Sequence, residues 1–211
     1  MALAKMSWDE LNQLVGRKIS EPYDEYYAPM HITEEQKRKR IRLAEDLEDV
    51  FIALLAELFY CEQEGIKIPA DIYDRALEEY LAVIGSAVVT DDYLIEHAIS
   101  TIADTIAVLK RHENQEYYYS MDRAMAISEG ESNSVWNYTE FEEAVKNKKF
   151  KTWHTIMDGK ERESHAEVNG LTIPIEDAFE LRGGYLRFPM DTELGCSDDE
   201  VVSCRCSLSF S

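Results

Sequence analysis

The stretch from Thr33 to Glu64, TEEQKRKRIRLAEDLEDVFIALLAELFYCEQE, decides the fold class of the N-terminal part of the chain. Thr33 followed by Gln36 is the pattern of a capping box, in which each side chain satisfies a backbone N–H at a helix start. Apolar residues then recur at helical spacing and predict one wide apolar face: Ile41, Leu43, Leu47, Val50, Phe51, Leu54, Leu55 and Leu58. We predict a helix that runs to about Glu64 and stops at Gly65.

Further helical patterns lie on both sides of this stretch. Ser7 and Glu10 form a second capping box on its N-terminal side. On its C-terminal side a helix is predicted over 71–84, and Thr90 is the expected N-cap of the next one. The apolar stripe of that next helix consists of Leu94, Ile99, Ile102, Ile106 and Leu109. We therefore expect residues 33–112 to form an antiparallel bundle with short connections.

The sequence pattern changes near residue 149. A helix is predicted around 121–136, and Thr139 with Glu142 forms a third capping box that opens a short final helix. After that, β-prone runs are separated by Gly, Pro, Asn and Asp; they are 150–157, 171–175, 185–188 and 201–210. The predicted class is α+β, with an N-terminal antiparallel helical bundle and a small C-terminal α+β unit. The expected divisions are a helical region (1–120), connecting helices (121–149) and the C-terminal unit (150–211).

The net charge of the chain disfavours non-specific binding to nucleic acid. The 211 residues include 42 acidic and 22 basic ones, which gives a formal net charge of −20. Such a chain repels nucleic acid on average, so a DNA contact would need a local basic patch. The only dense basic run contains Lys37, Arg38, Lys39 and Arg40. It is either a partner-binding patch or the solvated start of a helix, balanced by neighbouring glutamates.

The sequence predicts neither membrane association nor secretion. Its longest apolar stretch, 51–60, is too short for a membrane span and contains Glu57. The N-terminus lacks the apolar core of a secretory signal. Three of the four cysteines lie in the last 16 residues, which is not the pattern of a secreted disulfide framework. We expect synthesis in a reducing cytoplasm.

The cysteines near the C-terminus form the main candidate site. Cys204 and Cys206 lie in a predicted strand, and two thiolates with a histidine and one more ligand can bind zinc tetrahedrally. His165 is the candidate third ligand. The candidates for the fourth are Cys196, Asp158 and Asp191. Two alternatives remain open: buried cysteines packed beside a hydrogen-bonded histidine, or a nucleophilic thiolate activated by His165.

An ordered set of residues runs through about the last 60 positions: Trp153, Asp158, Arg162, His165, Gly170, Phe179, Gly184, Pro189, Asp191, Glu200, Cys204 and Cys206. This order resembles the Mu F-like domain of phage minor head proteins. That domain has a tryptophan-bearing strand, then D-x-R-x-x-H, a glycine, a phenylalanine, FPGD and finally NCRC. The helix expected around Asn133 and Asn137 also resembles the family, so the resemblance covers about 123–211.

Three positions depart from the family pattern. Met190 stands where FPGD has glycine, Ser203 stands where NCRC has asparagine, and Glu129-Gly130 stands where arginine and threonine are usual. Glycine permits backbone angles that methionine resists, so we expect Met190 to change the chemistry of its turn. The three expected ligands are all retained.

The resemblance implies a minor head protein that acts in head morphogenesis near the portal, and in DNA packaging or delivery. Its expected partners are the portal protein, other capsid proteins and packaged DNA. Its expected location is the virion head, after assembly in the host cytoplasm. It does not imply a proven catalytic activity, and our hypothesis is a structural site at His165, Cys204 and Cys206 in a protein that is not an enzyme. The alternatives are a phage-encoded nuclease or transferase and a prophage adaptor protein; the oligomeric state does not follow from the sequence.

Overall fold

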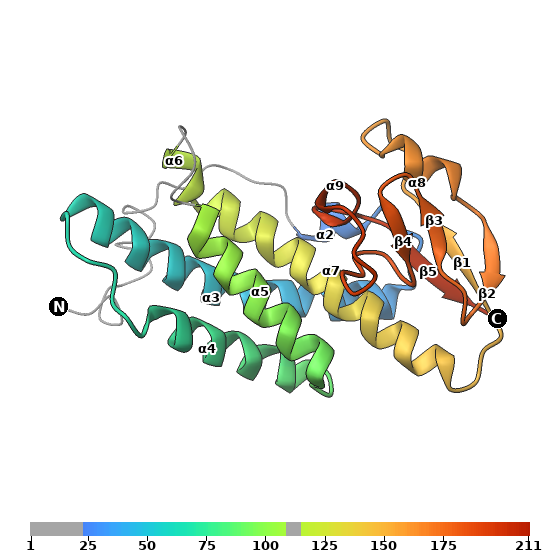
Figure 1. The fold of residues 1–211 in the computed structure, drawn as a ribbon, viewed down its shortest axis with the longest axis horizontal. Coiled ribbons are helices and arrows are strands. Elements are labelled where there is room, and N and C mark those ends of the chain that lie inside the picture. The colour runs from blue at the N-terminus through green and yellow to red at the C-terminus, as the bar shows by residue number, and fades with distance from the viewer. Residues whose placement is uncertain (1–22, 109–114) are drawn as a thin grey trace. The chain divides into compact units, whose positions relative to one another are not determined.

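The computed structural model describes residues 23–108 and 115–211 (Figure 1). These residues form two compact units. The helical unit comprises 42–108 and 115–128, and the mixed unit comprises 23–41 and 129–211. Helices ahead of a small C-terminal sheet region confirm the predicted α+β class.

Both boundaries between the units fall inside long helices. Helix α3 (Glu34–Gln63) gives its first turns to the mixed unit, and α7 (Met121–Val145) gives its first turns to the helical unit. The compact units therefore do not follow the divisions expected at residues 120 and 149. Whether those divisions mark separately folding segments stays a prediction.

Helix α3 begins and ends where the sequence predicts. Its first turn is closed by the capping box, since the N–H of Gln36 donates to Thr33 Oγ1 at 3.2 Å and the N–H of Thr33 donates to Gln36 Oε1 at 2.8 Å. It ends before Gly65, whose φ of 60° is a left-handed conformation that glycine adopts readily. Every member of the predicted apolar face is buried except Ile41, which is half-buried.

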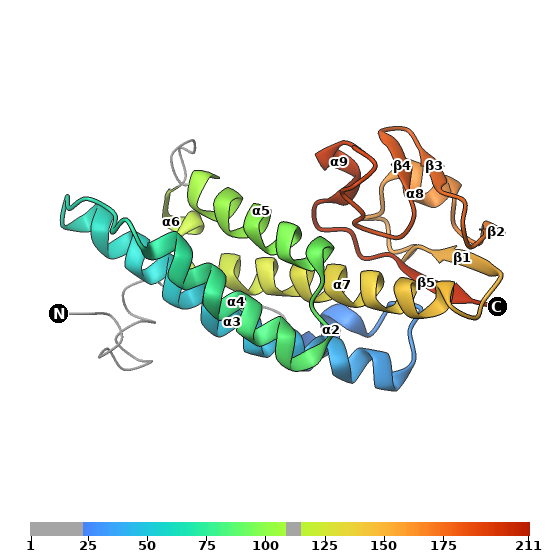
Figure 2. The same cartoon turned by 60° about the horizontal axis from the view of Figure 1, so that its bottom comes forward.

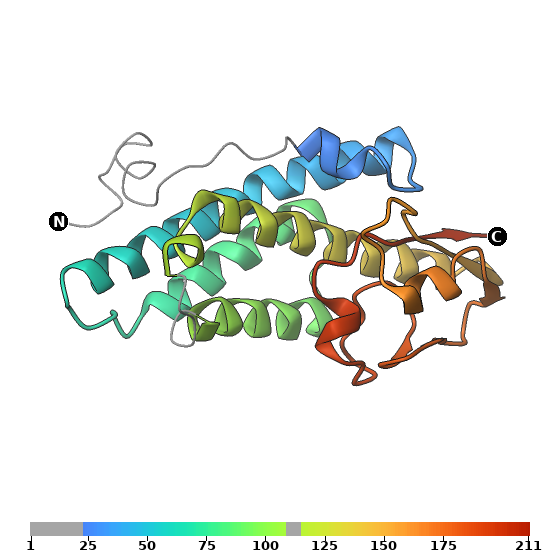
Figure 3. The ribbon, with the colours of Figure 1, turned by 90° about the horizontal axis from the view of Figure 1, so that it is seen from above.

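The helical unit also contains α4 (Ile72–Ala87), α5 (Asp92–Val108) and the short α6 (Gln115–Tyr118). Figure 3 shows α3 and α4 running in opposite directions. Arg75 of α4 bonds Glu57 of α3 at 2.8 Å, and the Tyr73 hydroxyl donates to the carbonyl of Ile99 in α5 at 3.3 Å. Apolar faces and short connections thus give the expected helix-on-helix packing.

Two expectations about α5 are wrong. Asp91, not Thr90, caps the helix, because the N–H of Leu94 donates to Asp91 Oδ1 at 3.1 Å. Ile99 was expected in the apolar stripe but is 41% exposed. The buried face keeps the predicted Leu94 and Ile102 and adds the smaller Ala98 and Thr105. Leu109 and the Ser7–Glu10 capping box lie outside the described residues.

Helix α7 is continuous, so the predicted break at Thr139 is wrong. The Thr139 hydroxyl donates to the carbonyl of Val135 at 2.8 Å, within the same helix. A threonine that bonds back to its own helix cannot cap a new one. As a result α7 continues to Val145 and leads directly into the first strand.

The mixed unit contains two small antiparallel sheets. In the larger one, β1 (Phe150–His154) lies between β2 (Thr172–Pro174) and β5 (Ser207–Phe210). In the smaller one, β3 (Phe179–Leu181) pairs with β4 (Gly184–Leu186). Figure 2 shows this second pair separate from the larger sheet. The short helices α8 (Glu163–Glu167) and α9 (Asp198–Val201) lie in the connections.

The segment 23–41 belongs to the mixed unit through specific hydrogen bonds. It contains α2 (Tyr23–Tyr27) and the start of α3. The Tyr27 hydroxyl donates to the carbonyl of Glu129 at 2.9 Å, and the Ser132 hydroxyl donates to the carbonyl of Arg40 at 2.7 Å. An early part of the chain is therefore built into the same unit as the C-terminal strands.

The strand predictions need two corrections. The pairing of Phe179–Leu181 with β4 was not predicted. Conversely, Cys204 and Cys206 do not lie in a strand, since β5 begins only at Ser207. The reason is local: Ser203 has a φ of 54°, which turns the chain and interrupts an extended conformation. Among the described residues, no helix combines the length and apolar character needed to cross a bilayer.

Candidate metal centre

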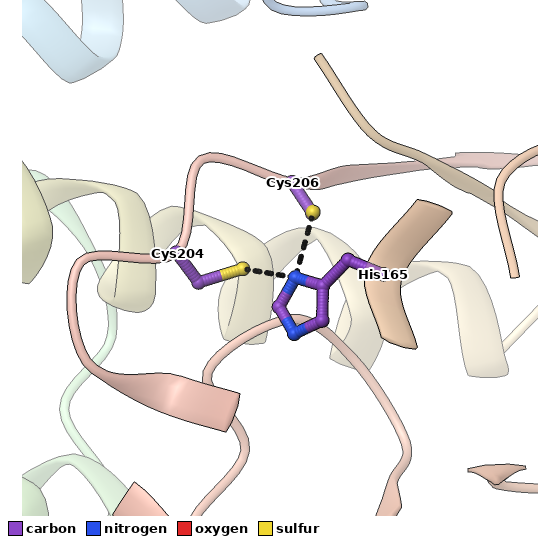
Figure 4. A group of neighbouring side chains, drawn as sticks. All are labelled: His165, Cys204 and Cys206. Atoms are coloured by element: carbon purple, nitrogen blue, oxygen red, sulfur yellow. Dashed lines mark hydrogen bonds between the residues drawn. The ribbon is translucent and has the colours of Figure 1, made fainter. Parts of the chain in front are cut away.

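Two elements bring His165, Cys204 and Cys206 together, as Figure 4 shows. His165 lies on α8, and both cysteines lie in the loop between α9 and β5. The imidazole Nδ1 lies 3.3 Å from Cys206 Sγ and 3.6 Å from Cys204 Sγ. All three potential ligand atoms lie within 4.8 Å of one another, and all three residues are buried.

The separations fit a tetrahedral metal site. With a zinc–sulfur distance of about 2.3 Å and a zinc–nitrogen distance of about 2.0 Å, tetrahedral geometry places nitrogen and sulfur about 3.5 Å apart. The two observed nitrogen–sulfur distances lie on either side of this value. Thiolates and imidazole are also the ligands that zinc prefers. This group could therefore hold a metal ion.

The two thiols are electrostatically unequal. The hydrogen bond from Cys204, and after it the contact with His165, lower the pKa of Cys206. The same hydrogen bond, followed by burial, raises the pKa of Cys204 well above its usual value. Cys206 is thus the more acidic thiol of the pair, and both cysteines would bind a metal as thiolates.

Strand β1 and the residues after it support the imidazole. The buried Trp153 ring meets the His165 ring edge-on, with centroids 5.6 Å apart. The Trp153 indole N–H donates to Thr155 Oγ1 at 3.0 Å, and the Thr155 hydroxyl donates to the carbonyl of His165 at 2.8 Å. Cys206 Sγ also lies 3.5 Å from Thr155 Oγ1. The tryptophan and the threonine together fix the place of α8 against the cysteine loop.

Two asparagines on α7 hold the cysteine loop by its carbonyl groups. The amide of Asn133 donates to the carbonyls of Cys204 at 3.1 Å and Cys206 at 3.3 Å, and that of Asn137 donates to the carbonyl of Cys206 at 3.2 Å. Their own oxygens accept from the Arg40 guanidinium at 3.1 and 3.3 Å. A continuous hydrogen-bond network therefore runs from Arg40 to the candidate ligands.

Arg40 does not belong to an exposed basic patch. It is fully buried and forms a two-point ion pair with Glu140 at 2.8 and 3.0 Å. Lys37 pairs with Asp24 at 2.9 Å, and Lys39 pairs with Glu35 at 3.3 Å. The burial of Arg40 corrects the expectation that it binds a partner. That role stays a prediction for Lys37, Arg38 and Lys39.

The candidates for a fourth ligand lie outside the group. Cys196 packs against Gly184, at the start of β4. Asp158 is paired with Arg205 at 2.7 Å. The Asp191 carboxylate is fully buried and accepts two hydrogen bonds from the Arg187 guanidinium, at 2.7 and 2.9 Å. In the described parts of the chain, only His165 and the two nearby cysteines form a group with metal-ligand spacing.

Other residues of the family pattern shape the connections around the centre. Arg162 donates to the carbonyl of Val202, close to the cysteine loop. Gly170 has a φ of 78°, and its N–H donates to the carbonyl of Trp153 at 2.8 Å. Pro189 lies within the turn that the Asp191 carboxylate closes by accepting from the N–H of Arg187 at 3.1 Å. These residues position the centre and are not ligands.

The two single-residue departures from the family pattern both fall at left-handed positions. Met190 has a φ of 71° and Ser203 a φ of 54°, and they are the two such non-glycine residues in the described chain. Met190 thus adopts the left-handed backbone that glycine favours, and whether it changes the chemistry of the turn stays a prediction. The Met190 side chain is buried, and its methyl group lies 3.9 Å from where a Cβ at Gly130 would be.

A small cavity borders the centre. Its volume is about 30 Å³, enough for about one water molecule. Its lining includes Thr155, Arg162, His165, Ser203, Arg205 and Cys206. A cavity of this size leaves room for a solvent molecule beside a bound metal, but not for a large substrate.

Glu200 on α9 is a site residue to which the sequence assigned no role. Its Oε2 lies 3.1 Å from His165 Nε2, on the side of the ring away from the thiols. The only sequence signal was its place in the ordered set that resembles the family. Its proximity to the histidine depends on the fold of two separate connections.

Comparison with known proteins gives one match. The family model described as Phage Mu protein F like protein matches residues 95–209, which is more than half of the chain. The match includes His165, Cys204 and Cys206. No curated protein and no solved structure matches the chain.

Proposed function

The chain belongs to the Phage Mu protein F-like family, and on this basis we propose that it is a minor component of the phage head that acts close to the portal. The family implies a head morphogenesis protein. The proposed partners are the portal protein and other capsid proteins, and the proposed location is the virion head. The observation that supports this is the match over 95–209, which contains nearly all of the C-terminal sheet region.

The proposed part in DNA packaging or delivery is indirect. With a net charge of −20 the chain is repelled by DNA on average, so contacts with other head proteins are favoured over contacts with packaged DNA. Helices α3 and α4 precede the matched stretch. We propose that these helices give the protein its own partner specificity.

The proposed metal is zinc, held by His165 Nδ1 and the sulfur atoms of Cys204 and Cys206. Bound there, zinc would supply a cross-link between α8 and the loop that precedes β5. Because β5 pairs with β1 at the edge of the larger sheet, this cross-link would fix the last strand. The nitrogen–sulfur distances of 3.3 and 3.6 Å and the burial of all three ligands support this role.

We propose that the protein is not an enzyme. A thiolate beside an imidazole resembles a nucleophilic pair, but both cysteines are at most 2% exposed and the adjoining cavity has a volume of only about 30 Å³. Incubation of the purified chain with DNA and RNA tests this. Cleavage that is lost in His165→Ala, in a protein that keeps its fold, would favour the nuclease alternative.

The head assignment is tested by quantitative mass spectrometry of density-purified particles, compared with nuclease-treated lysate. We expect the chain to co-purify with particles, at a few to a few tens of copies each, in constant ratio to the portal protein. Absence from the particles, with abundant protein in the lysate, would refute the assignment and favour a free adaptor.

A further inference from the structure

Glu200 is a buried carboxylate next to the candidate metal centre that does not face the metal position. It is 5% exposed and lies on α9, four residues before Cys204. A carboxylate buried this deeply is costly unless its oxygens are hydrogen-bonded. The hydrogen-bond partners of Glu200 therefore indicate which groups its carboxylate positions.

Both oxygens of Glu200 have partners from other elements. Oε2 accepts from the Ser164 hydroxyl at 2.7 Å, and Oε1 accepts from the backbone N–H of Gly183 at 3.0 Å. Oε2 also lies 3.1 Å from His165 Nε2. Ser164 and His165 are consecutive on α8, so the carboxylate contacts the histidine and its neighbour at once.

The turn between β3 and β4 is shaped to admit this carboxylate. A Cβ at Gly183 would lie 2.6 Å from Glu200 Cγ and 2.2 Å from Ser197 Oγ. Both distances are far inside contact range, so a residue with a side chain at 183 would displace Glu200. Ser197, the residue before α9, also donates its N–H to the carbonyl of Gly183 at 3.1 Å. The turn and α9 thus hold Glu200 in place from both sides.

The two ring nitrogens of His165 therefore face different groups. Nε2 faces the Glu200 carboxylate, and Nδ1 faces the two sulfur atoms. A neutral imidazole carries one proton, and a carboxylate beside one nitrogen keeps the proton there. The other nitrogen then presents its lone pair. Carboxylates hold metal-binding histidines in this way in many zinc sites, because they fix both the tautomer and the ring orientation.

We propose that Glu200 is the positioning residue of the metal centre: it keeps the proton of His165 on Nε2 and so makes Nδ1 the metal ligand. This proposal rests on the proposed zinc site. Glu200 Oε2 lies within hydrogen-bonding distance of His165 Nε2, at 3.1 Å, but the two atoms do not form a hydrogen bond in this structure. The positioning role requires that this bond forms when Nδ1 binds the metal.

The test compares Glu200→Gln with wild type and with Glu163→Gln. Glutamine keeps the shape of Glu200, but its amide can donate to Nε2 and so favours the proton on Nδ1, where a metal must displace it. Glu163 lies on α8, the helix that carries His165, and its exposed carboxylate pairs with Arg182 at 2.7 Å. Glu163→Gln is therefore the matched control for loss of a carboxylate charge. Zinc affinity of the full chain is measured by competition with a chromophoric chelator.

We expect a 10- to 100-fold loss of zinc affinity in Glu200→Gln, on the order of that seen when such carboxylates are removed from other zinc sites. Glu163→Gln should bind zinc like wild type. Long-range ¹H–¹⁵N NMR of the zinc-loaded wild type should show the His165 proton on Nε2 and coordination through Nδ1. If Glu200→Gln does not fold, Glu200→Asp replaces it, since the shorter carboxylate keeps the charge but withdraws from the ring.

The outcomes separate this proposal from the zinc site itself. Wild-type affinity and unchanged Nδ1 coordination in the Glu200 variants, even with a lower Tm, would overturn the positioning role and leave the zinc site standing. Coordination of wild type through Nε2 would overturn it as well. Absence of zinc binding by wild type would refute the proposed zinc site, and the positioning role with it.

Discussion

The helical unit and the mixed unit are stabilised by different kinds of interior. The helical unit buries mainly apolar side chains, such as Leu47, Phe51 and Tyr80, together with a few polar groups. In the mixed unit, charged and amide side chains lie among the most deeply buried residues, with Arg40 and Lys151 both at 0% exposure. An apolar interior tolerates many substitutions of similar volume. A buried polar network needs every partner in place, so it specifies one arrangement more strictly.

The largest expected effect comes from breaking the network at Arg40. Arg40→Ala leaves the Glu140 carboxylate without its two-point partner and the oxygens of Asn133 and Asn137 without donors. Removing one partner of a buried ion pair costs about 3–5 kcal/mol. We expect a loss of this size in the free energy of unfolding measured with urea.

The matched control for Arg40→Ala is Lys39→Ala. Lys39 is the preceding residue of the same helix, and its ion pair with Glu35 is exposed on both sides. Such a pair contributes at most about 1 kcal/mol. Equal losses in the two variants would show that the buried network is not what distinguishes the mixed unit.

The next largest effect is expected from removing the thiols. Cys204→Ser combined with Cys206→Ser should lower the Tm sharply, because the serines cannot hold zinc. At a free zinc concentration 100 times the Kd, bound metal would stabilise the fold by about 2.7 kcal/mol. A chelator should lower the Tm of wild type and leave the double variant unchanged. A melting curve that neither change moves would contradict a structural metal.

A third prediction concerns a buried charge whose removal should stabilise the protein. Lys151 Nζ lies over the rings of Phe141 and Phe179, at 4.6 and 5.6 Å. Burial, and after it the charge of Arg187, lower the pKa of Lys151 from 10.5 to about 8. The cation–π contacts only partly offset the cost of burying the ammonium group. We expect Lys151→Met to raise the free energy of unfolding at pH 7 by about 1–3 kcal/mol.

The dependence of this effect on pH gives an independent check. Between pH 8 and 10.5 the unfolded chain holds the Lys151 proton and the folded chain does not, so this group makes wild type more stable as the pH rises. The advantage of Lys151→Met should therefore shrink over that window. An advantage that stays constant from pH 7 to pH 10 would contradict the assigned cause.

The smallest effects concern the two left-handed residues. Ser203→Gly removes a left-handed strain of about 1–2 kcal/mol at a φ of 54° and deletes only an exposed side chain. Glycine costs about 0.5–1 kcal/mol of chain entropy, so the expected net gain is about 0.5–1 kcal/mol. Met190→Gly removes similar strain but deletes a buried side chain that accepts a weak hydrogen bond from Asn133. We expect that variant to be less stable than wild type.

Thermal unfolding of the two glycine variants measures this contrast directly. Stabilisation by both substitutions would mean that packing of the Met190 side chain beside Gly130 contributes less to stability than the backbone strain at Met190 costs. Destabilisation by both would mean that the strain at Ser203 is small.

Much of helix α3 follows from local sequence, because its capping and its apolar periodicity depend on near neighbours. The Thr33–Gln36 box and the stop at Gly65 are confirmed. Local rules fail where a side chain has two competing partners. Thr139 matches a capping pattern, yet its hydroxyl bonds back to Val135. Likewise Ile99 fits an apolar stripe, but the close packing of α5 uses Ala98 instead.

The sequence by itself determined the α+β class, the family and the identity of the three potential ligands, because these depend on the order and type of residues. Only the tertiary structure decided which atoms meet. In the sequence Arg40 lies within a basic run. In the structure it is linked to the loop that carries Cys204 and Cys206 through hydrogen bonds with Asn133 and Asn137. The tertiary structure also brought Glu200 to the far side of His165, through a glycine turn 17 residues earlier. Partners this far apart in the chain leave no local pattern, since only the packing of separate elements sets their distance.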